Sequence, residues 1–401
     1  MKFSIVIPAY NEEEAIGAVI EQCLKAKNNI IERTKVDDVE VIIVNDGSND
    51  KTKAISESYE AVKVISHETN LGYGSALKSG FASTSGDLIG FLDGDGTCDP
   101  MYFIGLINEI ERENADIALA SRMGSESEMP KIRRLGNKIF ASIISLIANT
   151  YVSDSSSGFR VFKRNSLSKL HPLPNGLHFV TAMSTRAVLD KNLTIVEMPI
   201  KYKERVGNSK LSVFQDGIKF LGTILEIGLT YKPLKFYGIT GFLFFLLSII
   251  LSINPIIYVI SQNNLEQINI LTHPFLNVYR IITIIVLVLS GLSFIFTGLL
   301  AEYTKETIDN HLSFTQSKSK TIGFNPPIYM LFLISFCSLL GATLLNLETI
   351  IQYTTTGIVD VNWLFVIIGA LLVLMSVQLF SLAILLRILL LYNWRLNSEN
   401  N

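Results

Sequence analysis

Apolar and polar residues alternate along the first half of the chain in a pattern that predicts short strands separated by amphipathic helices. The predicted strands are runs rich in β-branched and other apolar residues, at 3–7, 39–44, 62–65, 88–92 and 117–120. Between the first two, the apolar positions recur at helical spacing, in Ile16, Val19, Ile20, Cys23 and Leu24. Such alternation favours a mainly parallel sheet with helices on both faces. The fold class predicted for residues 1–210 is therefore α/β.

The first helix carries a start signal in the sequence. Asn11 is followed three residues later by Glu14, and this spacing resembles a capping box, in which the two side chains satisfy backbone N–H groups at a helix start. The pattern predicts that Asn11 is the N-cap residue of the first helix.

Charged residues become sparse after Lys235, and four long apolar stretches follow at about 236–260, 279–301, 328–349 and 363–391. Each reaches the roughly 20 residues that a helix needs to cross a bilayer core. One such stretch could be a buried helix of a soluble protein, but four of them favour an all-α transmembrane domain over residues 236–401. Residues 211–235 are predicted to form a juxtamembrane interfacial helix that leads into the first span.

Basic residues predict the orientation of the spans. Lysines and arginines precede the first span, lie between the second and third, and end the fourth, whereas the loops at 261–278 and 347–362 contain none. Because basic loops stay on the cytosolic side, we expect an integral membrane protein whose first domain is cytosolic. Three roles remain open for the spans: a membrane anchor, the interface of a homo-oligomer, or a path for lipid.

Composition excludes several classes of partner and site. The formal net charge of −2 gives no basic surplus for binding nucleic acid. The cysteines Cys23, Cys98 and Cys337 show neither CxxC nor zinc spacing, so a reducing compartment is expected. The N-terminal apolar run is too short for a signal peptide and is followed at once by acidic residues.

Acidic and amide residues follow three of the predicted strands. The segments are PAYNE at 8–12, NDGSND at 45–50 and DGD at 93–95. Because ligands of parallel α/β sheets bind at the carboxyl ends of the strands, these segments predict one site. Asp93 and Asp95 can share a hard divalent cation, and Mg²⁺ or Mn²⁺ suits such oxygen ligands. Gly72 and Gly74 let the backbone pass close to a ligand.

The order of these motifs, IPAYNE, VNDGSND, NLGYGSALKSGF, FLDGDG and SGFRVF, resembles the family-2 glycosyltransferases of GT-A fold across about residues 3–210. Within that family the chain is most similar to polyprenyl-phosphate (dolichyl-phosphate) mannosyl- and glucosyltransferases with C-terminal spans. The resemblance implies inverting transfer of a hexose from a UDP- or GDP-linked sugar to a polyprenyl or dolichyl phosphate at the cytosolic membrane face.

The resemblance also implies roles for single residues. Asp95, with Asp93, would bind the metal, and Asp154 would be the catalytic carboxylate. The residues implied to bind the nucleotide-sugar are Pro8, Tyr10, Glu12, Asp46, Asp50, Gly72, Lys78, Asp93 and Gly94. Those implied to bind the acceptor or its phosphate are Arg122, Arg133, Arg134, Arg160, Arg205, Ser209 and Lys210.

Residues 131–149 are basic at their start and then amphipathic, which favours a helix at the membrane surface over an ordinary core helix. In the implied reaction an acceptor phosphate oxygen attacks the anomeric carbon, and Asp154 either deprotonates or only orients it. Three alternatives stay open: another lipid acceptor, a polysaccharide synthase, or a non-catalytic membrane scaffold or flippase-like protein. The sugar and the nucleotide also stay open.

Overall fold

The computed structural model describes residues 1–205, 212–261, 278–313, 328–356 and 363–399. The chain divides into two compact units, Met1–Tyr231 and Lys232–Asn401. Helix α8 belongs to the first unit; the predicted sites Ser209 and Lys210 lie outside the described residues.

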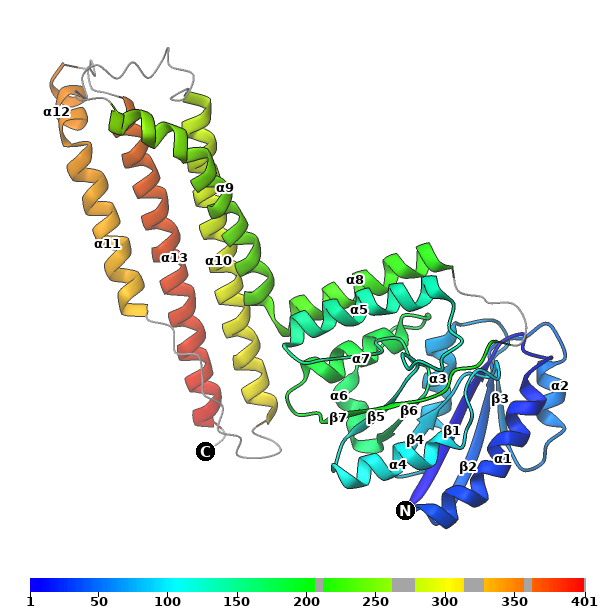
Figure 1. Ribbon diagram of the computed structural model, residues 1–401. Coiled ribbons are helices and arrows are strands. Elements are labelled where there is room, and N and C mark those ends of the chain that lie inside the picture. The colour runs from blue at the N-terminus through cyan, green and yellow to red at the C-terminus, as the bar shows by residue number, and fades with distance from the viewer. Residues whose placement is uncertain (206–211, 262–277, 314–327, 357–362, 400–401) are drawn as a thin grey trace. The chain divides into compact units, whose positions relative to one another are not determined.

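A seven-stranded sheet with the order β3-β2-β1-β4-β6-β5-β7 forms the centre of the first unit (Figure 1). Only β6 runs antiparallel to its neighbours, β4 and β5. The mainly parallel α/β fold is thus confirmed. The strands are β1 Lys2–Ala9, β2 Asp38–Asn45, β3 Lys63–Ser66, β4 Leu88–Phe91, β5 Ile117–Ser121, β6 Arg160–Lys163 and β7 Ile195–Pro199.

Helices cover both faces of this sheet. Phe3, Ile5 and Ile7 of β1 point to one face, where they are fully buried with apolar residues of α1 and α4. On the other face, α3 lies against β1 and β2 and also contacts α7. The helices of the first unit are α1 Ile16–Arg33, α2 Thr52–Glu57, α3 Tyr73–Ala82, α4 Tyr102–Arg112, α5 Lys131–Ala148, α6 Leu167–Leu170, α7 Phe179–Leu189 and α8 Val213–Tyr231, with a 3₁₀ turn at Arg164–Ser166.

The predicted start of the first helix was wrong. Helix α1 begins at Ile16, after an N-cap residue, Ala15, without a side-chain cap. Asn11 instead has a left-handed backbone with φ of 49°. Its side-chain oxygen accepts a hydrogen bond from the backbone N–H of Asn49 at 2.8 Å. The amide of Asn11 therefore joins two loops at the sheet edge rather than capping a helix.

Among the described residues of the second unit, four helices are long and apolar enough to cross a membrane, as predicted: Pro233–Ile257, Arg280–Glu306, Ile328–Leu345 and Phe365–Arg387. They belong to α9 Pro233–Ser261, α10 Val278–Ser313, α11 Ile328–Leu345 and α13 Trp363–Glu399, and the short helix α12, Leu347–Thr356, follows α11. Helices α9 and α10 pack closely at Gly241, where an added Cβ would lie 2.7 Å from the carbonyl oxygen of Gly291. Serines 335 and 376 exchange hydrogen bonds between α11 and α13.

A glycine on α3 sets how closely this helix approaches the sheet. A Cβ added at Gly80 would lie 2.3 Å from Cγ1 of Val6. We expect Gly80→Ala to destabilise the fold by about 1–3 kcal/mol, because the overpacking outweighs the better helix propensity of alanine. Thermal unfolding of the full chain in detergent measures the change.

Gly222 on α8 is the matched control, because an added Cβ there meets nothing within 4 Å. Gly222→Ala should leave the unfolding temperature unchanged or raise it. Equal unfolding temperatures for the two variants would contradict the close packing of α3.

Candidate active site

A cavity of about 540 Å³ opens at the carboxyl ends of β1, β2 and β4. It also reaches α5 and α8, so that residues from both ends of the first unit's sequence line one space. Many of the sequence-predicted residues line it: Pro8, Tyr10, Glu12, Asp46, Gly72, Asp93, Gly94, Asp95, Arg122, Arg133 and Arg205. The structure therefore brings the predicted donor-binding and acceptor-binding residues to a common cavity.

Asp46 follows β2 and is almost fully buried, with 2% of its surface exposed. The backbone N–H groups of Leu71 and Gly72 donate to its two carboxylate oxygens at 3.0 and 2.9 Å. Gly72 has φ of 100°, a conformation that glycine adopts without the strain imposed by a Cβ. The NLGYG segment thus folds around the Asp46 carboxylate.

Asp93 follows β4 and is held from two sides. The hydroxyl of Tyr73 donates to Oδ1 at 2.7 Å. On the other side, a Cβ added at Gly158 would lie 2.5 Å from Oδ2, so the chain passes Asp93 at a distance that only glycine allows. Burial and the charge of Asp95 raise the pKa of Asp93 to about 7.

Asp95 is the second carboxylate of this pair and is also buried. Its Oδ1 accepts a hydrogen bond from the hydroxyl of Thr97 at 2.7 Å, and its Oδ2 lies 3.3 Å from Nη1 of Arg205. Nη2 of Arg205 also forms a short ion pair with Glu12. One guanidinium therefore joins acidic residues that follow different strands.

The donor set at this edge fits a hard divalent cation whose remaining ligands come from a substrate. Burial first, and then the neighbouring charge of Asp95, raise the pKa of Asp93, and a bound cation would offset both effects. Within the described ranges, no group of three or more His, Cys, Asp or Glu side chains is placed to hold a metal ion. Mg²⁺ is commonly bound by one or two carboxylates together with substrate phosphates, and Asp93 and Asp95 match that arrangement.

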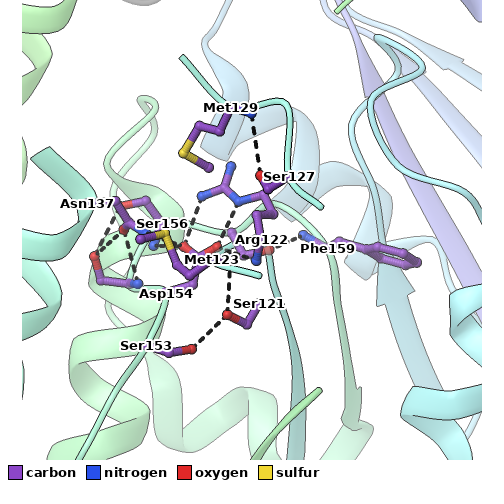
Figure 2. A network of polar contacts seen from close by, with 12 residues as sticks. Ser121, Arg122, Met123, Ser127, Met129, Asn137, Ser153, Asp154, Ser156 and Phe159 are labelled. Carbon is purple, nitrogen blue, oxygen red and sulfur yellow. Dashed lines mark hydrogen bonds and ion pairs between the residues drawn. The ribbon is translucent and has the colours of Figure 1, made fainter. Parts of the chain in front are cut away.

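Arg122 follows β5 and forms a buried network with Asp154, shown in Figure 2. Its Nε and Nη2 donate to the two carboxylate oxygens at 2.8 and 2.9 Å, and its backbone N–H donates to Oδ2 at 2.9 Å. Asn137 of α5 donates to Oδ1, also at 2.9 Å. Burial alone would raise the pKa of Asp154, but the charge and hydrogen bonds of Arg122 lower it.

These contacts change the interpretation of Asp154. Its side chain has no exposed surface and is not among the groups that line the cavity. A carboxylate with a lowered pKa and several donors is a poor base. The geometry supports neither predicted role of Asp154, as a base or as a group that orients the acceptor, because its side chain does not line the cavity. Its contacts indicate instead that it orients Arg122.

Two predicted phosphate-binding arginines do not line the cavity. Arg160 on β6 is 1% exposed and donates to backbone oxygens of Ser157 and Val180 and to the hydroxyl of Ser184. Arg134 on α5 donates to the carbonyl oxygens of Met123 and Gly124. Their placement does not support phosphate binding, because both guanidinium groups hold protein loops together.

Asp50 and Lys78 also lie outside the lining of the cavity. The carboxylate of Asp50 accepts hydrogen bonds from the backbone N–H groups of Glu13 and Thr52, and so connects the first two loops. Lys78 donates to the side-chain oxygen of Asn175 at 2.6 Å. Both residues support the segments that form the cavity wall, which is a less direct role than the predicted one.

The part of the cavity that faces α5 and α8 is more apolar. These two helices pack side by side (Figure 1), with the rings of Phe140 and Phe220 in edge-to-face contact at 5.9 Å. Gly136 and Gly217 also line the cavity here, and an added Cβ at Gly136 would meet nothing within 4 Å. The charged residues that line this side are Arg133, Lys219 and Asp216, and Nζ of Lys219 lies 3.7 Å from Oδ1 of Asp216.

Sequence reasoning missed several residues that shape the site. Asn137 contacts Asp154, the carbonyl oxygen of Asn175 accepts hydrogen bonds from the first turn of α3, and His67 contacts Asp46. Single amides and imidazoles between motifs carry no recognisable spacing. Only the position of His67, directly after β3, could have indicated a place at the same sheet edge.

Comparison with known proteins identifies the family. The sequence model described as "Glycosyl transferase family 2" matches residues 4–170. A UDP-N-acetylglucosamine–dolichyl-phosphate N-acetylglucosaminyltransferase of Methanococcus voltae is 30% identical over 220 residues, which are 49% of this chain and 84% of that protein. The chain belongs to glycosyl transferase family 2.

Two further proteins are similar to this chain. The low-salt glycan biosynthesis hexosyltransferase Agl6 of Haloferax volcanii is 31% identical over 221 residues. The match covers 53% of this chain and about half, 51%, of the length of Agl6. Among solved structures, glucosyl-3-phosphoglycerate synthase of Mycobacterium tuberculosis, crystallised with Mn²⁺, UDP-glucose and phosphoglyceric acid, has a TM-score of 0.46 and 21% identity. That similarity covers 57% of this chain and 79% of the other.

The buried pair of Arg122 and Asp154 yields a stability prediction. Asp154→Ala should cost about 3–5 kcal/mol of unfolding free energy, because it leaves a buried guanidinium without its counter-charge. Since the folded-state pKa of Asp154 is lowered, its contribution is complete at neutral pH and is lost only as the pH falls below the usual value of 3.8. Denaturant unfolding in detergent at pH 7 measures the loss.

Glu57 provides a matched control, because its carboxylate pairs with Lys53 on an exposed helix surface. Glu57→Ala should change the unfolding free energy by less than about 1 kcal/mol. If both alanine variants had similar stabilities, the buried pair would not contribute as its contacts indicate.

Proposed function

We propose that this family-2 glycosyltransferase moves a hexose from a UDP- or GDP-linked sugar to a polyprenyl phosphate, with inversion at the anomeric carbon. The observation that carries the proposal is the continuity of one cavity. The cavity runs from carboxylates at the sheet edge, past Arg122 and Arg133, to the apolar side formed by α5 and α8. The dolichyl-phosphate acceptor named for the Methanococcus voltae relative supports this choice.

The donor side is the end of the cavity at β1 and β2. Pro8, Tyr10 and Asp46 line it and would hold the nucleoside. Asp46 can only accept hydrogen bonds as a carboxylate, which suits the ring N–H of uracil or guanine. The NLGYG segment that folds over Asp46 would close this pocket.

Asp93 and Asp95 would hold Mg²⁺ or Mn²⁺ together with the diphosphate. A bound divalent cation supplies Lewis-acid stabilisation of the charge on the departing nucleoside diphosphate. Arg205 pairs with Glu12 and Asp95 in this structure. On donor binding its guanidinium would turn to the diphosphate, since a planar guanidinium binds phosphate oxygens through paired hydrogen bonds.

The acceptor side is the end of the cavity at α5 and α8. An acceptor phosphate oxygen would attack the anomeric carbon as the bond to the diphosphate breaks, and the electron pair of that bond leaves with the nucleoside diphosphate. A phosphate monoester, with a second pKa of about 6, is mostly dianionic at neutral pH, so the attack needs no strong base. Arg122, oriented by Asp154, and Arg133 would hold this phosphate.

The apolar faces of α5 and α8 support a position at the bilayer surface. Ile132, Leu135, Ile139 and Leu146 of α5 are more than half exposed, as are Phe214 and Ile218 of α8. Helix α8 ends at Tyr231, two residues before the first apolar helix begins at Pro233. Exposed apolar residues beside lysines and arginines are typical of helices that lie in a membrane interface. We place this unit on the cytosolic side, following the basic residues near the spans.

The metal assignment is tested by Asp95→Ala. Purified protein in detergent is screened with radiolabelled UDP- and GDP-sugars, polyprenyl phosphate and Mn²⁺ or Mg²⁺, and lipid-linked label is counted. We expect wild type to transfer from one donor, and Asp95→Ala to lose at least about a hundredfold in rate, the size expected for removing one group that stabilises transition-state charge.

Asp38→Ala is the control, because Asp38 is an exposed acid that pairs with Lys2 and Lys27 at the opposite end of β2. It should keep wild-type activity. Transfer by Asp95→Ala at the wild-type rate would remove the metal assignment, and the absence of transfer by wild type from every donor would remove the proposed function.

The acceptor side is tested at Gly136. A leucine there would project into open space of the cavity, so Gly136→Leu should lower kcat/KM for a long-chain polyprenyl phosphate at least tenfold and leave the donor KM within about twofold. Each tenfold loss corresponds to about 1.4 kcal/mol. Steady-state kinetics with the donor and the acceptor varied separately measure both values.

Gly222→Leu on α8 adds the same side chain outside the cavity lining and should leave both constants unchanged. An unaltered acceptor kcat/KM in Gly136→Leu would show that the acceptor does not pass between α5 and α8.

A further inference from the structure

We propose that His67 is a positioning residue that fixes the Asp46 carboxylate for recognition of a nucleobase ring N–H, and so contributes to the choice of nucleotide. The inference rests on the proposed function, because it concerns the donor pocket of that reaction. It assigns a role to a histidine that does not line the cavity and belongs to none of the motifs above.

The geometry places His67 directly behind Asp46. His67 follows the edge strand β3, and its backbone N–H donates to the carbonyl oxygen of Asn45 at 2.9 Å. Its Nδ1 lies 2.7 Å from Oδ1 of Asp46, and its Nε2 lies 2.9 Å from the hydroxyl oxygen of Ser79 on α3. The imidazole therefore bridges α3 and the end of β2.

The chemistry of the pair determines which atom donates. A carboxylate accepts hydrogen bonds, so Nδ1 must carry the proton that lies between His67 and Asp46. In the neutral imidazole Nε2 is then an acceptor, and the Ser79 hydroxyl donates to it. Asp46 thus selects the tautomer, and the Ser79 hydroxyl holds the other side of the ring and helps to orient it.

The donors around Asp46 leave one direction for a ligand. His67 and the Leu71 N–H both donate to Oδ1, whereas the Gly72 N–H donates to Oδ2. A carboxylate oxygen has room for about two hydrogen bonds, so Oδ2 retains acceptor capacity in a residue that lines the cavity. Without the imidazole, the carboxylate could rotate and share its oxygens differently among the backbone donors.

This arrangement predicts which bases bind. Uracil and guanine each present a ring N–H beside a carbonyl group and can donate to Oδ2. Cytosine presents a ring nitrogen acceptor at the corresponding position, so this nitrogen would face Oδ2 without a proton between them, and the remaining acceptor capacity of Oδ2 would stay unused. Discrimination built on an unpaired buried polar group is steep, and it depends on the carboxylate holding one orientation.

A packing role for His67 makes a different prediction. The side chain is 11% exposed, so replacing it with any smaller residue would leave a void between α3 and β2. In that case the shape of the replacement would matter and its hydrogen-bonding capacity would not. The two roles can therefore be separated by comparing two variants of His67. One replaces it with a residue of similar size that has no hydrogen-bond donor, and the other with a smaller residue that has a donor.

The experiment compares His67→Phe, which fills the space without a donor, with His67→Asn, whose side-chain amide can place an N–H near the position of Nδ1. Binding of UDP, GDP and CDP to the full chain in detergent with Mn²⁺ is measured by calorimetry. Donor KM and kcat are measured in parallel, and circular dichroism and thermal unfolding check the fold of each variant.

For wild type we expect UDP or GDP to bind at least tenfold more tightly than CDP. In His67→Phe the preferred diphosphate should bind about tenfold more weakly, as expected for loss of one hydrogen bond to a charged group, and the preference over CDP should shrink. The donor KM should rise by a similar factor, with kcat within about threefold. His67→Asn should recover most of the affinity and the preference.

Two results would overturn the inference alone. One is a folded His67→Phe that keeps wild-type affinity and preference, and the other is a His67→Asn that is as weak as His67→Phe, which would indicate packing. Wild type that binds none of the three nucleotides would instead remove the proposed function together with this inference.

Discussion

Repulsion between buried and half-buried carboxylates at one edge of the sheet is the constraint on which the rest of the site depends. The parallel strands β1, β2 and β4 deliver Glu12, Asp46 and the pair Asp93 and Asp95 to a common cavity. Burial makes this charge costly unless positive groups or hydrogen-bond donors compensate it. Backbone N–H groups donate hydrogen bonds to the Asp46 carboxylate, which also contacts His67. The Tyr73 hydroxyl donates to Asp93, and the positive charge of nearby arginines stabilises it. Arg205 forms ion pairs with Asp95 and Glu12. Burial and the charge of Asp95 together still raise the pKa of Asp93.

The need to compensate buried charge also explains why Arg122 and Arg160 have different roles. Asp154 neutralises part of the charge of Arg122, which nevertheless lines the cavity. Arg160 does not line the cavity, and its hydrogen bonds hold the loop before β6 to α7. A buried ion pair of this kind contributes geometry more than net stability. In the proposed reaction Asp154 therefore acts through Arg122 and does not exchange a proton with the acceptor.

Much of the fold and part of the site could be predicted from the sequence, because the signals that determine them are local in the chain. Long apolar runs and strand–helix alternation are local signals, and the first five strands and the four membrane-type helices follow them. β6 and β7 were not predicted, and β6 runs antiparallel within a mainly parallel sheet, which the alternation rule does not provide for. Asn11 has cap-like spacing with Glu14, but its amide bonds to Asn49 across two loops. The partners of Lys78 and Asp154 lie 97 and 32 residues away along the chain, and no spacing rule relates such residues.

The central claim is that the acidic edge of the sheet holds a divalent cation shared with the leaving diphosphate. Its most direct test is X-ray diffraction from crystals of the protein grown with Mn²⁺ and UDP or GDP, recorded at the manganese absorption edge. We expect one anomalous peak within ligand distance of Asp95 and of diphosphate oxygens, about 2.0–2.6 Å for hard cations of this kind, with Arg205 no longer paired to Asp95. A nucleotide bound at β1 and β2 with no anomalous peak at Asp95, and Arg205 still paired to it, would show that these carboxylates do not hold the cation.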